Sequence, residues 1–289
     1  GNWDACSGYH YDDTTLKGFS HTHLSGTGCI DLGDILFRPT TLKPDLTTEN
    51  IYQPAAFSHK DEDASAGYYS VVLKEEGIKA ELTATAHAGI HRYTFPSGKE
   101  ASIIIDLAHL LDNEYIYEAE LEQTAANEIT GMRRTRGWTD NQYVYFVAQF
   151  SKPFQAIDFI QNKKMVSAGV KLIGTDLQAC LSFDNSNGEP VIAKVGLSIV
   201  SEKNARENLE AEVIGFDFDA VRSAARSAWE QALSAITVEG SNTDDLKNFY
   251  TAMYHSMVVP NAVSDVNGEY RRHNMEIGQL PKGKVQYST

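Results

Sequence analysis

The chain has 289 residues, 42% hydrophobic and 22% charged, which is enough to bury one large core or one core and a smaller unit. Its 25 basic and 39 acidic residues give a net charge of −14, which repels a phosphate backbone and argues against a nucleic-acid partner. No run of about 18 apolar residues occurs, so we expect no membrane span.

The first residues, GNWDACSGYH, contain no initiator Met and neither the basic nor the apolar region of a signal peptide. We therefore expect no export signal in this chain and a start inside a domain. The three cysteines, Cys6, Cys29 and Cys180, have no CxxC spacing. At most one disulfide is possible, and Cys6 with Cys29 is the candidate pair.

Residues 18–29, GFSHTHLSGTGC, place two histidines on one face of an extended chain, because side chains two apart point the same way. Serines flank His21 and His23, and the glycines that follow allow close backbone approach to a ligand. This pattern suits a metal site, a catalytic pair or the polar wall of a sugar pocket. The spacing supplies no third ligand, and calcium prefers oxygen, so metal binding is the weakest of the three.

From residue 1 to about 215 the sequence predicts antiparallel strands separated by turns. In IKAELTATA, from Ile78 to Ala86, apolar residues alternate with polar ones, which is typical of a strand buried on one face. Many short strands at regular spacing favour a two-sheet sandwich over a single sheet.

Near residue 216 the apolar period changes from 2 to 3.6. This predicts a helix over 217–236, with Asp217 or Asp219 as N-cap, and a second over 243–258, with Thr243 as cap and Pro260 as stop. We interpret 216–240 as a helical linker and 241–289 as the beginning of a helical domain. The apolar stripe of the second helix is made by Leu246, Phe249, Tyr250, Met253 and Met257.

Several weaker signals have ordinary explanations. Asp12-Asp13, Asp31 with Asp34, and HKDED at 59–63 lack the spacing of an EF-hand loop and are more simply solvated acidic turns. Asn267-Gly268 predicts a turn. His255, on the second predicted helix, is expected to be a core residue.

The segments NWDACSGYHYDD, GFSHTHLSGTGC, HKDEDASAGYYSVVL, GWTDNQYVYFVAQFSKPF and NFYTAMYHSMVVPNAVSDVNGEYR resemble, in collinear order, the N-terminal half of glycoside hydrolase family 92. This family comprises calcium-dependent, inverting exo-alpha-mannosidases. The resemblance implies a mainly β chain: an antiparallel β-supersandwich over 1–215, a linker helix, and the first helix of a truncated (α/α)6 barrel.

The resemblance also implies a function, the removal of alpha-linked mannose from glycans such as N-glycans. It places the catalytic carboxylates and the calcium ligands in the barrel, beyond Thr289, so we expect no catalytic residue and no bound metal in this chain, and no activity from it alone. The implied partners are mannose-containing glycans and the barrel domain. The complete protein is expected to be periplasmic or secreted.

In this resemblance the opening stretch forms the sandwich side of the sugar pocket. The implied substrate-binding residues are Trp3, Ser20, His21, His23, Ser25, Gly26, Thr27, Gly28 and Cys29. Trp3 is either a stacking platform or a core residue, and Ala5 stands where family members often carry a second aromatic residue. Two other functions remain open, a carbohydrate-binding sandwich without catalysis and a structural domain. The apolar stripe of the second helix favours the enzyme fragment, because a finished lectin has no use for it.

Overall fold

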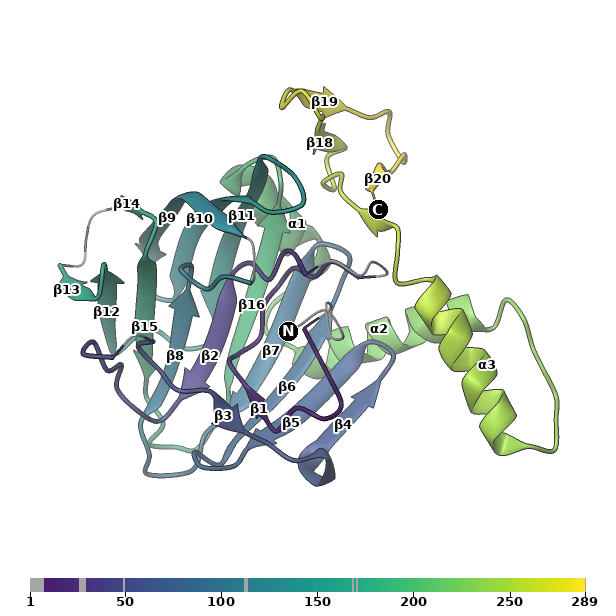
Figure 1. Cartoon of the computed structure of the whole chain (residues 1–289), viewed down its shortest axis with the longest axis horizontal. Helices are drawn as coiled ribbons and strands as arrows, with labels where there is room; N and C mark the ends of the chain where they lie inside the picture. The colour runs from purple at the N-terminus through teal and green to yellow at the C-terminus, as the bar shows by residue number, and fades with distance from the viewer. Residues whose placement is uncertain are drawn as a thin grey trace.

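A computed structural model describes residues 8–25, 30–48, 50–111, 114–167, 169 and 171–288. Two antiparallel sheets face each other in it (Figure 1). The large sheet has the order β14-β9-β10-β11-β16-β7-β6-β5-β4, and the small sheet has the order β13-β12-β15-β8-β2. The predicted fold class, a mainly β antiparallel sandwich followed by helices, is confirmed.

The bounds of the elements are as follows. The large sheet consists of β4 (Glu62–Ser65), β5 (Tyr68–Leu73), β6 (Ile78–Ala84), β7 (Ala88–Thr94), β9 (Tyr115–Ala125), β10 (Glu128–Arg136), β11 (Gln142–Phe150), β14 (Leu172–Gly174) and β16 (Val191–Ser198). The small sheet consists of β2 (Leu36–Thr40), β8 (Ala101–Asp106), β12 (Ala156–Gln161), β13 (Lys164–Val166) and β15 (Leu177–Phe183). A short pair, β1 (Thr15–Leu16) with β3 (Ala55–Ala56), and the 3-10 turn η2 (His59–Asp61) complete the sandwich. The helices are α1 (Glu202–Glu212), α2 (Phe218–Leu233) and α3 (Thr243–Ser256), and β17 (Asn261–Ala262), β18 (Glu269–Arg271), β19 (Ile277–Gln279) and β20 (Tyr287–Ser288) follow them.

The main core lies between the two sheets. Aromatic side chains fill its centre, and Phe37, Tyr93, Phe146 and Phe150 are fully buried there. Each such side chain contributes about 1.5–3 kcal/mol relative to an exposed one. A smaller cluster on the outer face of the small sheet contains Cys180, whose buried thiol is free.

Helix α1 covers the outer face of the large sheet, and the sequence did not predict it. The helix approaches β16 so closely that a Cβ on Gly196 would lie 2.3 Å from the Ala205 carbonyl oxygen. Its buried residues are Asn204, Ala205, Asn208 and Leu209. Because two of these are asparagines, the apolar periodicity that reveals a helix is absent. The strands of the sandwich therefore end at Ser198 rather than near residue 215.

The predicted alternation from Ile78 to Ala86 holds only at the start of β6, since Ala84 and Ala86 are exposed. Ile78 and Ala80 are buried in the main core, but Glu81 and Thr83 on the other face are buried as well. Glu81 accepts a hydrogen bond from the Tyr68 hydroxyl at 2.9 Å and forms an ion pair with Arg92 at 2.8 Å. Helix α2 packs on this polar face, so it is not solvated as the sequence suggested.

Both predicted helices are present, with their ends inside the expected ranges. Asp217 caps α2, and its side chain accepts the Ala220 N–H at 2.9 Å. The cap of α3 is Asn242 instead of Thr243. No residue of α3 is buried, and His255 is exposed, so its assignment to a core was wrong. Helix α3 extends away from the sandwich in Figure 1.

The segment after α3 folds into small hairpins. The turn expected at Asn267-Gly268 is present, since the Gly268 N–H donates to the Asp265 carbonyl at 2.8 Å. Strands β18 and β19 pair directly after it.

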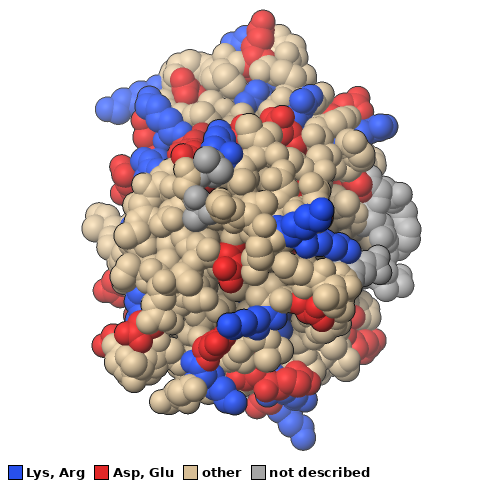
Figure 2. Space-filling model, turned by 90° about the vertical axis from the view of Figure 1, so that its left-hand side faces the viewer, with Lys and Arg blue, Asp and Glu red and all other residues tan. Residues whose placement is uncertain are grey.

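On the side of the molecule that carries β12–β14, at the left of Figure 1, acidic and basic side chains are interspersed (Figure 2). The coloured part of this face has no continuous basic area of the kind that binds nucleic acid. Among the described residues, no helix is long and apolar enough to cross a membrane.

Candidate functional site

The segment that carries the two histidines folds back on itself at one end of the sandwich. Two antiparallel bridges, Phe19 with Phe37 and His23 with Leu32, pair the chain before the turn with the chain after it. The His21 N–H donates to the Asp34 carbonyl at 2.9 Å. We call residues 18–34 the rim segment. Gly26, Thr27, Gly28 and Cys29 lie outside the described residues, as do Trp3, Ala5 and Cys6. The predicted roles of these residues and the Cys6–Cys29 pairing therefore stay predictions.

The His21 side chain points inward and packs against the sandwich. Its Nδ1 donates to the Ile35 carbonyl oxygen at 2.6 Å, and its ring stacks on His91 with centroids 4.8 Å apart. Burial lowers the pKa of His21 to about 4, so the ring is neutral at physiological pH. Its Nε2 is buried without a hydrogen bond. These contacts make His21 part of the framework that supports the rim segment.

His23 and the two serines lie nearer to solvent. His23 is exposed, while Ser20 and Ser25 are half-buried. The Ser20 hydroxyl lies 3.3 Å from the His23 Nε2. The structure thus brings Ser20 and His23 together at the surface, and these are the groups of the rim segment that could meet a ligand.

Asp31 and Asp34 are buried, so they are not the solvated turn that we expected. One oxygen of Asp34 accepts from the Thr22 hydroxyl at 2.8 Å and from the Gln142 amide at 3.0 Å, while the other lies 3.1 Å from Arg133 Nη1. Asp31 accepts the N–H of Leu32 at 2.8 Å and that of Trp138 at 2.6 Å. Both carboxylates are therefore committed to holding the rim segment against the β10–β11 turn.

Arg133 on β10 is the fully buried centre of this cluster. It lies between Asp34 and Glu114, at 3.7 Å from the latter, and its Nη2 donates to the His109 carbonyl. Burial raises the pKa of Glu114 to about 7, against the opposing effects of the Leu111 N–H and Arg133. A carboxyl group with such a pKa could serve as a general acid. The Glu114 side chain is only 1% exposed, however, so it has no access to a substrate in this chain.

The described residues do not fit a calcium site. Among them, no group of three or more His, Cys, Asp or Glu residues could hold a metal ion. The acidic cluster of the rim already contains a guanidinium group. The expectation that the fragment binds no metal stays a prediction.

The segment after α3 returns to this same end of the large sheet, on its outer face. Asp265 is buried and accepts hydrogen bonds from Ser198, Asn204 and Asn208 at 2.7–2.8 Å. The Arg271 guanidinium lies over the Tyr143 ring, 4.4 Å from its centroid. Because Gln142 bonds to Asp34 and its neighbour Tyr143 contacts Arg271, the rim segment and the C-terminal segment meet at the start of β11. We call this region the junction.

His87, in the β6–β7 turn, links three elements at the junction. Its Nδ1 lies 2.5 Å from Glu212 at the end of α1, and its Nε2 lies 2.8 Å from the Ser264 carbonyl oxygen. A ring with two such partners must carry both protons. Burial alone would lower the pKa of His87, but the hydrogen bond and charge of Glu212 outweigh it, and the pKa is raised. In turn, burial of Glu212 is outweighed by the His87 bond, and its pKa is lowered.

We expect attachment of the 261–266 segment to depend on pH. Because the pKa of His87 is higher in the attached state than the unfolded value of about 6.5, the protonated ring stabilises attachment. This stabilisation is complete below about pH 6.5 and is lost as the pH rises through the pKa of the attached state. The lowered pKa of Glu212 contributes above about 4.3, its unfolded value, and is lost as pH falls through the folded value. Amide exchange at Val263–Asp265 should therefore be slower, after correction for intrinsic rates, at pH 6 than at pH 9. The corrected difference should vanish in His87→Gln, and its persistence there would contradict the assignment.

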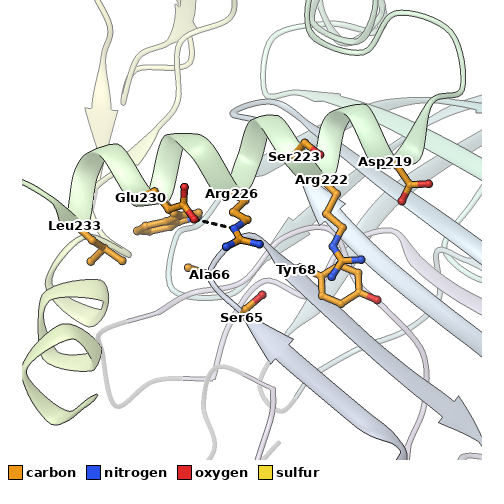
Figure 3. A pocket seen from close by; sticks show the side chains of 10 residues that line it. Ser65, Ala66, Tyr68, Asp219, Arg222, Ser223, Arg226, Glu230 and Leu233 are labelled. Carbon is orange, nitrogen blue, oxygen red and sulfur yellow. Dashed lines mark hydrogen bonds and ion pairs between the residues drawn. The ribbon is translucent and has the colours of Figure 1, made fainter. Parts of the chain in front are cut away.

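A surface cavity of about 550 Å³ lies beneath α2 (Figure 3). Arg222 and Arg226 point into it together with Ser65 and Tyr68, and Arg226 is paired with Glu230 at 2.7 Å. None of its lining residues belongs to the rim segment or the junction. Opposite charges cancel along its wall, so we do not assign the candidate site to it.

The fold and site define an antiparallel two-sheet sandwich joined to the start of a helical domain, with a hydrogen-bonded polar rim where the two meet. Residues 1–198 match the glycosyl hydrolase family 92 N-terminal domain, and residues 204–289 match the glycosyl hydrolase family 92 catalytic domain. The chain belongs to glycosyl hydrolase family 92.

Solved relatives agree with this assignment. The family GH92 alpha-mannosidase BT3965 of Bacteroides thetaiotaomicron is 36% identical, with a TM-score of 0.92 over 98% of this chain. Its complex with mannoimidazole gives the same TM-score. An uncharacterized secreted glycosidase of Arthroderma benhamiae is 28% identical over 293 residues, 91% of this chain and 37% of that protein. The chain thus spans about 39% of the length of the solved relative and 37% of the curated one.

Proposed function

We propose that this chain is the N-terminal part of an exo-acting alpha-mannosidase and forms one wall of its active site. The observation that carries the proposal is the 36% identity, across 98% of the chain, with a protein described as an alpha-mannosidase and solved with mannoimidazole. The proposed substrates are glycans with terminal alpha-linked mannose, such as N-glycans. The relative described as secreted supports a periplasmic or secreted location for the complete protein.

The proposed reaction is hydrolysis with inversion. It needs a general acid for the leaving oxygen and a general base for water, about 6.5–9.5 Å apart. The buried carboxylates of the rim and junction are engaged by backbone N–H groups, amides and arginines, so they are poor candidates for these roles. We place acid, base and calcium ligands beyond Thr289, in the barrel domain. The work of this chain is to bind and orient the sugar and to exclude water.

In this proposal the surface groups of the rim segment face the sugar. Ser20 and His23 offer hydroxyl and imidazole hydrogen bonds. His21, fixed by Ile35 and His91, maintains the position of the segment. Supporting this placement, the junction brings the stretch that matches the catalytic domain to the same end of the sandwich.

A carbohydrate-binding sandwich without catalysis is the second candidate. One observation favours the enzyme: α3 exposes an apolar face, since none of its residues is buried and Leu246, Phe249 and Met253 remain half-exposed. A self-contained lectin would not require that face.

The test compares this chain with a longer protein that includes the barrel domain. Residues 1–289 alone should hydrolyse no aryl alpha-mannoside above background, with or without calcium, because acid and base catalysis normally supply several orders of magnitude. The longer protein should turn over, and His23→Ala should lower its kcat/KM. Lys99→Ala is the control, because Lys99 is exposed in the turn between β7 and β8, at the opposite end of these strands from the rim segment.

Each possible result discriminates between the candidates. Hydrolysis of the aryl alpha-mannoside by residues 1–289 alone would contradict the fragment proposal. Saturable mannose binding by this chain, with no turnover by the longer protein, would establish the lectin alternative. An unchanged His23→Ala enzyme would reduce His23 to part of the framework.

A further inference from the structure

Trp138 is presented to solvent by a turn that the protein holds firmly. The side chain is 73% exposed, on the connection between β10 and β11. An indole is among the side chains that gain most from burial, so its exposure on a fixed turn calls for a ligand or partner. Its backbone N–H is held at 2.6 Å by Asp31, a buried residue of the rim segment.

The fixation of this turn is built into the sequence. A Cβ on residue 137 would lie 2.1 Å from the Asp31 carboxylate oxygen, so only a glycine at this position lets the Asp31 side chain approach the backbone of the turn. The Gly137 N–H donates to the Thr139 carbonyl at 3.1 Å, and the Arg134 guanidinium contacts the Asn141 amide oxygen. The turn that carries the indole is therefore fixed beside the rim segment by the Asp31 carboxylate, by Gly137 and by its own hydrogen bonds.

We propose that Trp138 is a stacking platform for the sugar unit that follows the terminal mannose of an oligosaccharide. This inference rests on the proposed function. A flat indole face suits the C–H face of a pyranose ring, and aromatic side chains carry a large share of binding free energy at such sites. The exposed Arg136–Asp140 pair beside it offers a donor and an acceptor for sugar hydroxyls. Asp31 thereby couples the platform to the segment that faces the terminal mannose.

The experiment uses the longer, barrel-containing protein and two substrates. Alpha-mannosyl fluoride has a leaving group that presents nothing to the platform, whereas alpha-linked mannobiose presents a second sugar. In Trp138→Ala, kcat/KM for mannobiose should fall about tenfold, or 1.4 kcal/mol, mainly through KM. In the same variant, kcat/KM for the fluoride should stay within about twofold of the unmutated protein. Trp138→Phe should keep most of the kcat/KM for mannobiose that Trp138→Ala loses.

Controls separate the possible failures. Tyr11→Ala removes another exposed aromatic side chain, 68% exposed and stacked on His59, and should affect neither substrate. Equal losses on both substrates in Trp138→Ala, or a lowered melting temperature, would overturn the proposal and indicate that the indole packs against the barrel domain. If the unmutated protein hydrolyses neither substrate, the proposed function itself fails.

Discussion

Replacing Arg133 with methionine is expected to lower the free energy of unfolding by about 3–5 kcal/mol, the usual cost of breaking a buried ion pair from one side. Methionine fills a similar volume but leaves Asp34, which is fully buried, without its cation. The Thr22 and Gln142 hydrogen bonds remain, and they cannot replace a full charge. Glu114 is affected less, because burial already raises its pKa to about 7 and it can take up a proton.

Denaturant unfolding followed by circular dichroism measures this effect. Arg136→Met is the matched control on the same strand, because Arg136 is 61% exposed and pairs with an exposed Asp140 at 3.7 Å. It should cost less than about 1 kcal/mol. The double variant Arg133→Met with Asp34→Asn should recover part of the loss, since the charge left behind is removed. A loss below about 1 kcal/mol for Arg133→Met would mean that water reaches this cluster.

The sequence could predict what depends on local periodicity. The alternation from Ile78 to Ala80 reflects burial on one face, and the 3.6-residue repeat from Val221 correctly predicted the helix α2, although only its first turn is buried. Tertiary contacts override the pattern elsewhere. Glu81 and Thr83 look solvated in sequence, but α2 and Arg92 bury them.

Helix α1 was missed for the same reason. Asn204 and Asn208 occupy its buried face because a carboxylate 57 to 61 residues further along the chain accepts their amide protons. No local signal predicts such a partner. The Ser201 cap and the helix-forming residues that follow it were the local signal available.

In the candidate site, too, the sequence predicted the local features and missed those that depend on tertiary contacts. The residue types and spacing of Ser20, His21 and His23 predicted a polar surface, but not that His21 would turn inward onto His91. The two acids at 31 and 34 looked like a solvated turn, because Arg133 and Trp138 lie about 100 residues away in sequence. Buried charges find their partners through the fold, and a single sequence does not record that pairing.

These long-range contacts connect the rim segment to the C-terminal segment at the start of β11. Asp34 fixes the start of β11 through Gln142, and Tyr143 receives Arg271 on the opposite face of the sheet. Any change that detaches the segment around Asp265 should therefore be felt at the rim segment, although the two lie on different faces.

Replacing Asp265 with alanine is expected to detach this segment while leaving the sandwich folded. Asp265 accepts three side-chain hydrogen bonds at 2.7–2.8 Å, and each bond to a charged acceptor contributes about 1.5–3 kcal/mol. Alanine would leave the Ser198 hydroxyl and one amide N–H each of Asn204 and Asn208 without an acceptor, while the second amide bonds to Glu269 and Leu197 remain. We therefore expect local opening to become easier by about 3–5 kcal/mol. Hydrogen exchange of Val266–Arg271 should accelerate accordingly, while exchange in β7 should not change.

Asp265→Asn, which keeps one acceptor, should give an intermediate effect. Glu276→Ala is the control in the same segment, because its pair with Arg272 is exposed and should contribute less than about 1 kcal/mol. Equal acceleration in β7 and in the 266–271 stretch would show that the junction and the sandwich unfold as a single unit, and would contradict a separable attachment centred on Asp265.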